Sequence, residues 1–273
     1  MKKTLIFGCG NRLPYYLNRS KNRRFVGIID NDESRVGEIY CGLKVFSVND
    51  VSKLDFDEVC VVISDQSVRQ QLIDMKVNSE QIFYPARDEL VEPAFTSAPF
   101  RQSAERLLCE LTQHFRSAGV VLYSEFGTAL GMFRSGQIIA HDDDIDVTVL
   151  RESATEEQVA ALCRGFQSHE FGPTVQFSSS VDRAGSPMWS LTLPSSSATL
   201  GMYFRESIGG GLMRCGGESF TDVSVRHFVE PVEHAVDFGV VNLPFETDAY
   251  LTSLYGSQWR TPTRAWSYQD YGS

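Results

Sequence analysis

The chain has 273 residues, which is long for one compact core and suits two domains of roughly 100 to 200 residues each. Hydrophobic residues make up 42% of it and charged residues 22%, a composition that argues against disorder. The formal net charge is −10, so no general positive field draws the protein to nucleic acid or to anionic lipid. Any phosphate group that it binds must therefore be held locally.

The cysteines and the apolar runs of the sequence indicate in which cellular compartment the protein is expected. The six cysteines are scattered without a C-x-x-C pair, so we expect reduced thiols and neither a disulfide framework nor a zinc site. The apolar run near the N-terminus stops at Gly8 and is interpreted as a first strand, not as a signal peptide. No run approaches the roughly 18 apolar residues of a membrane helix, so we expect a cytoplasmic protein without a transmembrane segment.

The first third of the chain alternates short apolar strands with helices. Strands are expected at 3–7, 25–29, 58–63 and 81–84, and helices at 13–19 and 67–75. This alternation predicts an α/β domain over residues 1–88, a small parallel sheet with Rossmann-like winding.

A linker is expected over residues 86–99, where Pro93 and Pro99 follow Pro85 and periodicity is weak. A second domain should then occupy residues 100–273. It opens with a helix over 102–117 whose apolar residues form one buried stripe. The later elements are expected as strands at 120–123, 145–150, 189–193 and 199–204, helices at 127–135 and 154–165, and a turn at 195–197.

A run of aspartates leads into the strand expected at 145–150. If that strand extends back far enough, Asp142, Asp144 and Asp146 point to one face, because side chains alternate along a strand. Neighbouring carboxylates repel one another unless a cation lies between them, and hard oxygen ligands suit Mg²⁺ or Mn²⁺. We therefore predict a metal site at Asp144 and Asp146. A solvated acidic loop or a calcium site is the alternative interpretation.

A phosphate-binding turn is predicted just upstream, where Gly127 and Thr128 lie between a strand and a helix. Free backbone N–H groups at a helix start bind phosphate oxygens, and glycine permits close approach. Arg134, near the end of that helix, could bind the same phosphate with its forked donors. Taken alone, the Gly-Thr pair is more typical of an ordinary helix start.

Two motifs together resemble a known family. The segment from Glu125 to Val147 reads E-x-G-T-x-x-G-x-x-R-x-G-x-I followed by D-D-D-I-D-V. It resembles the LicD family, whose typical pattern is E-C-G-T-L-L-G and then W-D-D-D-I-D, with Phe126 here in place of Cys and His141 in place of Trp. Residues 250–262 are similar to that family's Y-L-x-x-x-Y-G-x-x-W-x-x-P ending.

The resemblance implies a nucleotidyltransferase-type α/β (α+β) fold in the second domain. It also implies transfer of a phosphorylated group, phosphocholine in the namesake activity, from a nucleoside-diphosphate-linked donor to a glycan or lipid-linked glycan acceptor. Gly127 and Thr128 would then cradle donor phosphate, Asp144 and Asp146 would hold Mg²⁺ or Mn²⁺, and Asp142 would complete the catalytic carboxylates.

One position departs from the family pattern. A later strand of the family commonly carries an aspartate in an apolar-Asp-Ile-Phe segment, and Gly201 stands there in this chain. Either Asp142, Glu206 or Asp222 then serves as the base, or the enzyme is weak or inactive.

The aromatic residues near the C-terminus have two interpretations. They could line an acceptor pocket by stacking on sugar or choline, or they could pack in the core. The residues concerned are Tyr250, Tyr255, Trp259 and Trp266.

The first domain carries half of a dinucleotide-binding fingerprint. Gly8 and Gly10 follow the first strand, Leu13 stands where the third glycine would fall, and Asp30 lies where a ribose-binding carboxylate belongs. The segment is similar to small Rossmann-like domains attached to sugar-modifying transferases. Such a domain could bind a nucleotide or a nucleotide sugar, or it could serve only for docking.

Several functions stay open on the sequence alone. The first is a LicD-like phosphotransferase, and the second is a nucleotidyltransferase that acts on a small acceptor. A noncatalytic nucleotide- or sugar-binding relative is the third, motivated by Gly201. An NAD-dependent oxidoreductase is least favoured, because no general-acid partner stands out.

Overall fold

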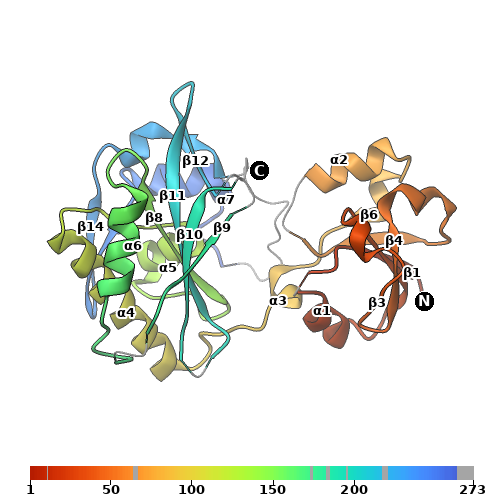
Figure 1. The fold of residues 1–273 in the computed structure, drawn as a ribbon, viewed down its shortest axis with the longest axis horizontal. Helices are drawn as coiled ribbons and strands as arrows, with labels where there is room; N and C mark the ends of the chain where they lie inside the picture. Colours follow the sequence, from red (N-terminus) through yellow and green to blue (C-terminus); the bar gives the residue numbers. More distant parts are fainter. Residues whose placement is uncertain are drawn as a thin grey trace. The chain divides into compact units, whose positions relative to one another are not determined.

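The computed structural model describes residues 1–10, 12–63, 67–172, 175–182, 185–194, 196–216 and 221–262, with only the backbone of residues 87 and 88. Within these ranges the chain forms two compact units, Met1–Glu92 and Pro93–Pro262 (Figure 1).

The region expected as a linker contains helical structure on both sides of the unit boundary. Helix α3 (Arg87–Leu90) lies before it, and helix α4 (Ala98–Ser117) starts inside the expected linker. Pro99 lies in the first turn of α4, where the missing N–H of a proline leaves no helical hydrogen bond unmade. One of the prolines that suggested a linker therefore begins a helix.

The first unit is built on one six-stranded sheet in the order β3-β4-β2-β1-β5-β6. All of its neighbouring strands run parallel except the edge pair of β3 and β4. The Rossmann-like parallel sheet is thus confirmed. The elements are β1 (Lys3–Phe7), α1 (Leu13–Arg19), β2 (Arg24–Asp30), η1 (Glu33–Arg35), β3 (Ile39–Tyr40), β4 (Leu43–Ser47), η2 (Val48–Lys53), β5 (Glu58–Val61), α2 (Ser67–Asp74), η3 (Ser79–Gln81) and β6 (Ile82–Phe83).

Both faces of this sheet are covered, as an almost wholly parallel sheet requires. Leu5 of β1 packs in one apolar cluster with Val68 and Leu72 of α2. Ile6, the next residue, packs in another cluster with Leu13 of α1 and Leu90 of α3. Alternate side chains of the central strand therefore point to opposite faces, each of which is closed by a helix.

The second unit is built on a nine-stranded mixed sheet. Seven strands follow one another in the order β13-β12-β11-β8-β7-β15-β14, while β10 pairs with β11 and β9 with β10. Its strands are β7 (Tyr123–Ser124), β8 (Asp144–Leu150), β9 (Ser178–Val181), β10 (Pro187–Thr192), β11 (Thr199–Gly209), β12 (Leu212–Cys215), β13 (Val223–Ser224), β14 (Val232–Val236) and β15 (Gly239–Leu243). Its other helices are α5 (Phe126–Ser135), α6 (Glu156–Gly165), η5 (Val225–Phe228) and α7 (Thr247–Tyr255).

The central strand β8 has one apolar and one polar face. Ile145, Val147 and Val149 are fully buried, and they alternate with Asp144, Asp146 and Thr148. On the apolar side, Cys163 of α6 contacts Met202 of β11. On the polar side, the hydroxyl of Thr148 meets Glu125, the residue immediately before α5. The sheet therefore presents its carboxylates toward the start of α5.

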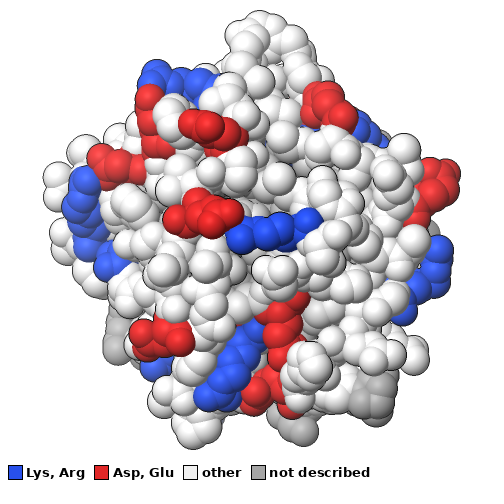
Figure 2. Space-filling model, turned by 90° about the vertical axis from the view of Figure 1, so that its left-hand side faces the viewer, with Lys and Arg blue, Asp and Glu red and all other residues white. Residues whose placement is uncertain are grey.

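The charges on the surface are mixed. On the face that Figure 2 shows, acidic and basic side chains are interspersed. Ion pairs such as Arg151 with Glu156, 2.7 Å apart, and Arg116 with Glu233, 3.0 Å apart, also set opposite charges side by side. Among the described residues, no helix combines the length and the apolar composition that crossing a membrane would need.

Candidate active site

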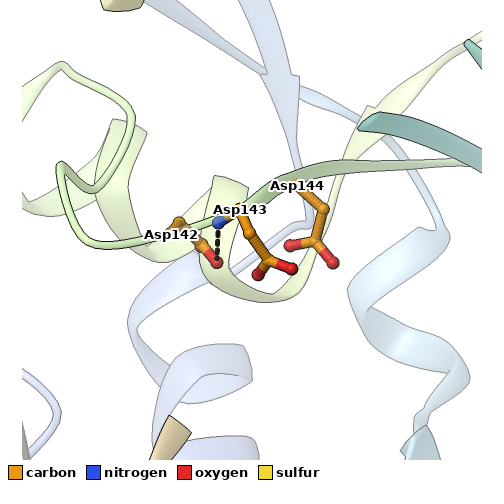
Figure 3. Close-up of side chains that lie close together, drawn as sticks. All are labelled: Asp142, Asp143 and Asp144. Atoms are coloured by element: carbon orange, nitrogen blue, oxygen red, sulfur yellow. Dashed lines mark hydrogen bonds between the residues drawn. The ribbon is translucent and has the colours of Figure 1, made fainter. Parts of the chain in front are cut away.

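Three consecutive aspartates come together at the start of β8. Asp142 and Asp143 precede the strand, and Asp144 is its first residue. Carboxylate oxygens of the three residues lie within 4.8 Å of one another (Figure 3). The backbone N–H of Asp143 donates a hydrogen bond of 3.1 Å to Oδ1 of Asp142, which is 8% exposed. This three-carboxylate group has the ligand type and spacing for a divalent cation.

The members of the three-carboxylate group differ from the set that strand alternation predicts, which was Asp142, Asp144 and Asp146. Because β8 begins at Asp144, Asp142 and Asp143 lie outside the strand and need not alternate between its faces. Both of their carboxylates lie close to that of Asp144. Asp146 lies on the same face of β8 as Asp144, about 7 Å further along the strand, and is not a member of the group. The metal pair Asp144 and Asp146 stays a prediction, and Asp143 joins the candidate ligands.

Gly127 lies directly against the three-carboxylate group. A Cβ atom on this residue would be 2.5 Å from Oδ2 of Asp142, so only glycine lets the carboxylate approach the first turn of α5 this closely. The N-terminal end of a helix carries a partial positive charge that favours anions. A donor phosphate at this turn would also meet the Asp142 carboxylate, and a cation would have to lie between the two negative groups.

Thr128 contacts the strand that carries the carboxylates. It is 2% exposed, and its Oγ1 accepts a hydrogen bond of 2.9 Å from the backbone N–H of Asp146. The backbone N–H of Glu125 donates to the carbonyl of Asp146, at 3.0 Å. These two bonds fix Asp146 relative to the start of α5. The direct contact of Thr128 with phosphate stays a prediction.

Arg134 lies near the opposite end of α5 from Gly127. The two positions are seven residues apart, which is about 10 Å along the helix axis. The guanidinium of Arg134 instead donates to the carbonyl of Trp259, at 3.4 Å. Burial lowers the pKa of Arg134. The binding of one phosphate by both Arg134 and Gly127 stays a prediction.

Glu125, the first residue of the motif, forms a buried ion pair with Arg205. Both side chains are fully buried, and two bonds of 2.5 and 2.7 Å join the guanidinium to the carboxylate. The hydroxyls of Thr148 and Tyr250 also donate to Glu125, at 2.8 and 2.9 Å. Although burial alone would lower the pKa of Arg205, the adjacent Glu125 carboxylate raises it above its usual value. Sequence reasoning missed Arg205, which no local motif marks.

The aromatic residues near the C-terminus pack mainly inside the unit. Tyr250 is fully buried, and Trp259 is 5% exposed and lies 5.8 Å from the ring of Phe133. Core packing is therefore the correct interpretation for these two residues, and an acceptor pocket formed by them is not supported. Trp266 lies outside the described residues.

Gly201 is the register partner of Asp146 on the neighbouring parallel strand. Of the three residues named as replacements for a carboxylate there, Asp222 forms an ion pair of 2.7 Å with Arg214. Glu206 points to the opposite face of β11, since it lies an odd number of residues from Gly201. Only Asp142 belongs to the three-carboxylate group.

In the first unit, Asp30 is engaged by the chain itself. Its Oδ2 accepts from the backbone N–H of Cys9, at 2.7 Å, and its Oδ1 from that of Asp32, at 2.9 Å. Gly8 has a φ of 109°, a conformation that favours glycine, and the Cβ position of Gly10 faces open space. Asp30 thus fixes the glycine turn, and nucleotide binding by Gly8, Gly10 and Asp30 stays a prediction.

Comparison with known proteins bears on both units. Residues 119–183 match the family model described as "LicD/FKTN/FKRP, nucleotidyltransferase domain", and residues 1–83 match the one described as "C2185-like, N-terminal". A ribitol-5-phosphate transferase FKTN of Macaca fascicularis is 26% identical over 180 residues, 62% of this chain and 36% of the relative. The chain thus spans about a third of that relative's length. The predicted resemblance to LicD is confirmed.

Two solved structures show weak likeness over most of the chain. A UDP-N-acetylglucosamine 3-dehydrogenase GnnA of Acidithiobacillus ferrooxidans has 12% identity and a TM-score of 0.25, covering 89% of this chain and 82% of its own. A DAP dehydrogenase of C. glutamicum has 11% identity and a TM-score of 0.27, with 95% and 88% covered. These scores are too low to support any statement about function.

Proposed function

Because its second unit carries a LicD-type nucleotidyltransferase segment, we propose that the chain is a metal-dependent transferase. It moves a phosphorylated group from a nucleoside-diphosphate-linked donor to a glycan or lipid-linked glycan acceptor. The observation that carries the proposal is the placement of Asp142, Asp143 and Asp144 against the glycine turn of α5. The macaque relative is named a ribitol-5-phosphate transferase, which agrees with this reaction class, and phosphocholine is the other candidate for the transferred group.

The residues at this position fit a divalent cation. Three carboxylates within 4.8 Å of one another repel unless a cation or a shared proton lies between them. Oxygen ligands suit Mg²⁺ and Mn²⁺, which in such sites also contact substrate phosphates. Asp142, Asp143 and Asp144 would hold the ion, together with Asp146 in the predicted set. When bound, the ion would neutralise charge that develops on the transferring phosphoryl group.

The protein's own groups have separable roles in this proposal. The backbone N–H groups at the start of α5 orient the donor phosphate. One carboxylate of the predicted set, with Asp142 as the candidate, accepts the proton of the attacking acceptor hydroxyl. The buried pair of Glu125 and Arg205 holds the start of α5 against the sheet, so that both groups keep their positions.

A thermal-shift screen tests the proposal. Cytidine and uridine diphosphate conjugates are each added with and without Mg²⁺. A donor at 100 times its Kd stabilises the native state by about 2.7 kcal/mol. We expect at least one conjugate to raise the Tm only when Mg²⁺ is present. If every conjugate leaves the Tm unchanged in Mg²⁺, the proposal is wrong.

Two other functions make different predictions. A nucleotidyltransferase that acts on a small acceptor releases pyrophosphate, whereas the proposed reaction releases a nucleoside monophosphate. A noncatalytic binding relative is favoured by Gly201, which lacks the carboxylate of the family pattern beside Asp146. Donor binding without turnover against a broad panel of acceptors would support that relative.

A further inference from the structure

Gly201 lies within β11, beside the carboxylate of Asp146. It pairs with Asp146 of β8 on one side and with Ser190 of β10 on the other. Register partners on neighbouring strands point to the same face of a sheet. A side chain at position 201 would therefore extend into the space next to Asp146.

Tyr203 fills that space. Its hydroxyl oxygen lies 2.8 Å from the position of a Cβ atom on Gly201, and its Cε2 and Cζ atoms lie at 2.9 and 3.1 Å. The carboxyl group of an aspartate starts one bond beyond Cβ, so the phenol occupies the space that this carboxyl group would take. A glycine inside a strand often marks such a close approach.

The other edge of the ring also lies against a glycine. Cδ1 of Tyr203 is 3.8 Å from the Cβ position of Gly216, and Oδ2 of Asp182 is 3.9 Å from the same position. Tyr203 itself is half-buried. The half-buried ring thus lies on the polar face of the sheet, flanked by two positions without side chains.

We propose that Tyr203 contacts the substrate, in the place where the family pattern carries a carboxylate. Its hydroxyl donates a hydrogen bond to a phosphoryl oxygen of the donor beside Asp146. A carboxylate only accepts hydrogen bonds and needs a cation to meet a phosphate, whereas a neutral phenol can donate directly. This inference rests on the proposed transferase function and explains how the site operates with glycine at position 201.

The variant Tyr203→Phe tests this role, because it keeps the ring over Gly201 and removes only the hydroxyl. Loss of one donor to a developing charge typically lowers kcat by about 100-fold or more. We expect a loss of that order, with Tm and Mn²⁺ affinity unchanged. Tyr15→Phe is the control, since its hydroxyl accepts a hydrogen bond from Arg19 on the exposed side of α1 in the first unit and its loss should leave the rate unchanged. A wild-type rate in Tyr203→Phe would show that the ring serves for packing alone.

A double variant that replaces the Tyr203 ring by a carboxylate at position 201 gives a second test. Gly201→Asp on a Tyr203→Ala background restores a carboxylate where the ring no longer blocks it. We expect this double variant to regain part of the rate that Tyr203→Ala loses, and to reach half of its maximal rate at a lower Mg²⁺ concentration, because the added carboxylate beside Asp146 attracts the cation. A double variant no more active than Tyr203→Ala at any Mg²⁺ concentration overturns the inference. Wild-type protein without Mg²⁺-dependent turnover overturns the proposed function, and the inference with it.

Discussion

The hydroxyl of Tyr250 donates a hydrogen bond of 2.9 Å to Oε2 of Glu125, 125 residues earlier in the chain. The two segments that resemble the LicD family therefore meet in one buried network. The network also contains Arg205, whose remaining donors reach the carbonyls of Met213 and Thr221 at 3.2 and 3.0 Å. Because its members come from α7, β11 and the start of α5, this network joins the helix that bears Gly127 to the sheet.

Removing Arg205 should destabilise the protein strongly. Arg205→Met leaves the Glu125 carboxylate buried without its counter-charge, a change that typically costs about 3 to 5 kcal/mol. Tyr250→Phe removes one donor and should cost about 1 to 3 kcal/mol. The free energy of unfolding in urea measures both. Arg226→Met breaks the exposed pair with Glu246 and should cost less than about 1 kcal/mol. An Arg205→Met variant as stable as Arg226→Met would refute this assignment.

The sequence carries enough information for part of this site. The alternation of apolar and acidic residues correctly placed β8 and its polar face, and the motif spacing correctly placed Gly127 at the start of α5. The partner of Glu125 was not predictable, because Arg205 lies 80 residues away and is brought in only by the pairing of β11 with β8. A signal for Tyr203 did exist. A glycine two residues before a tyrosine in a strand places the ring over the empty position.

The fold was predictable to a similar degree. Strands β1, β2, β5 and β6 of the first unit agree with their expected positions to within a few residues, since each is a short apolar run bounded by polar turns, whereas β3 and β4 were missed. The strand expected at 120–123 is reduced to Tyr123–Ser124. In the second unit, strands β9 and β12 to β15 were missed, because these short segments become strands through pairing with their partners in the sheet and not through their own periodicity.

Gly127→Ala should weaken metal binding. The new methyl group would lie 2.5 Å from Oδ2 of Asp142, so the carboxylate must shift. Changes that displace a ligand in this way typically weaken metal affinity by about tenfold or more. Calorimetry with Mn²⁺ measures the effect. Gly165→Ala at the end of α6 meets no atom within 4 Å and should leave Mn²⁺ binding unchanged. Equal Mn²⁺ affinity in the two variants would speak against a metal site at Asp142.

Ionisation of the buried Glu105 carboxyl group should lower the free energy of unfolding as the pH rises. This residue is 3% exposed, and burial raises its pKa, although the N–H of Ile138 and the charge of Arg101 oppose the shift. The stability that the protonated form provides is complete below the unfolded pKa of about 4.5, and it is lost as the pH rises through the higher folded pKa. Glu105→Gln should therefore raise the Tm at pH 7, with a gain that disappears near pH 4. A gain that persists at pH 4 would contradict this sign.

Cys41 should be the one thiol of the native protein that reacts readily. It is exposed, while Cys9, Cys60, Cys109, Cys163 and Cys215 are buried. Burial raises the pKa of Cys60 and Cys163 to about 12, which suppresses the reactive thiolate. Iodoacetamide at pH 8, followed by mass spectrometry, should add one label to the native protein and six after unfolding. Rapid addition of one label to a Cys41→Ser variant would show that a second thiol is accessible.

The measurement that tests the central claim most directly is Mg²⁺-dependent release of nucleoside monophosphate from a diphosphate-linked donor in the presence of a glycan acceptor. Wild-type protein, Asp144→Asn and Asp146→Asn are compared, with Tm as the control for folding. We predict release by the wild type only when Mg²⁺ is present, and no detectable release by either variant at an unchanged Tm. Full activity in Asp144→Asn or in Asp146→Asn would contradict a metal-dependent transferase built on these carboxylates.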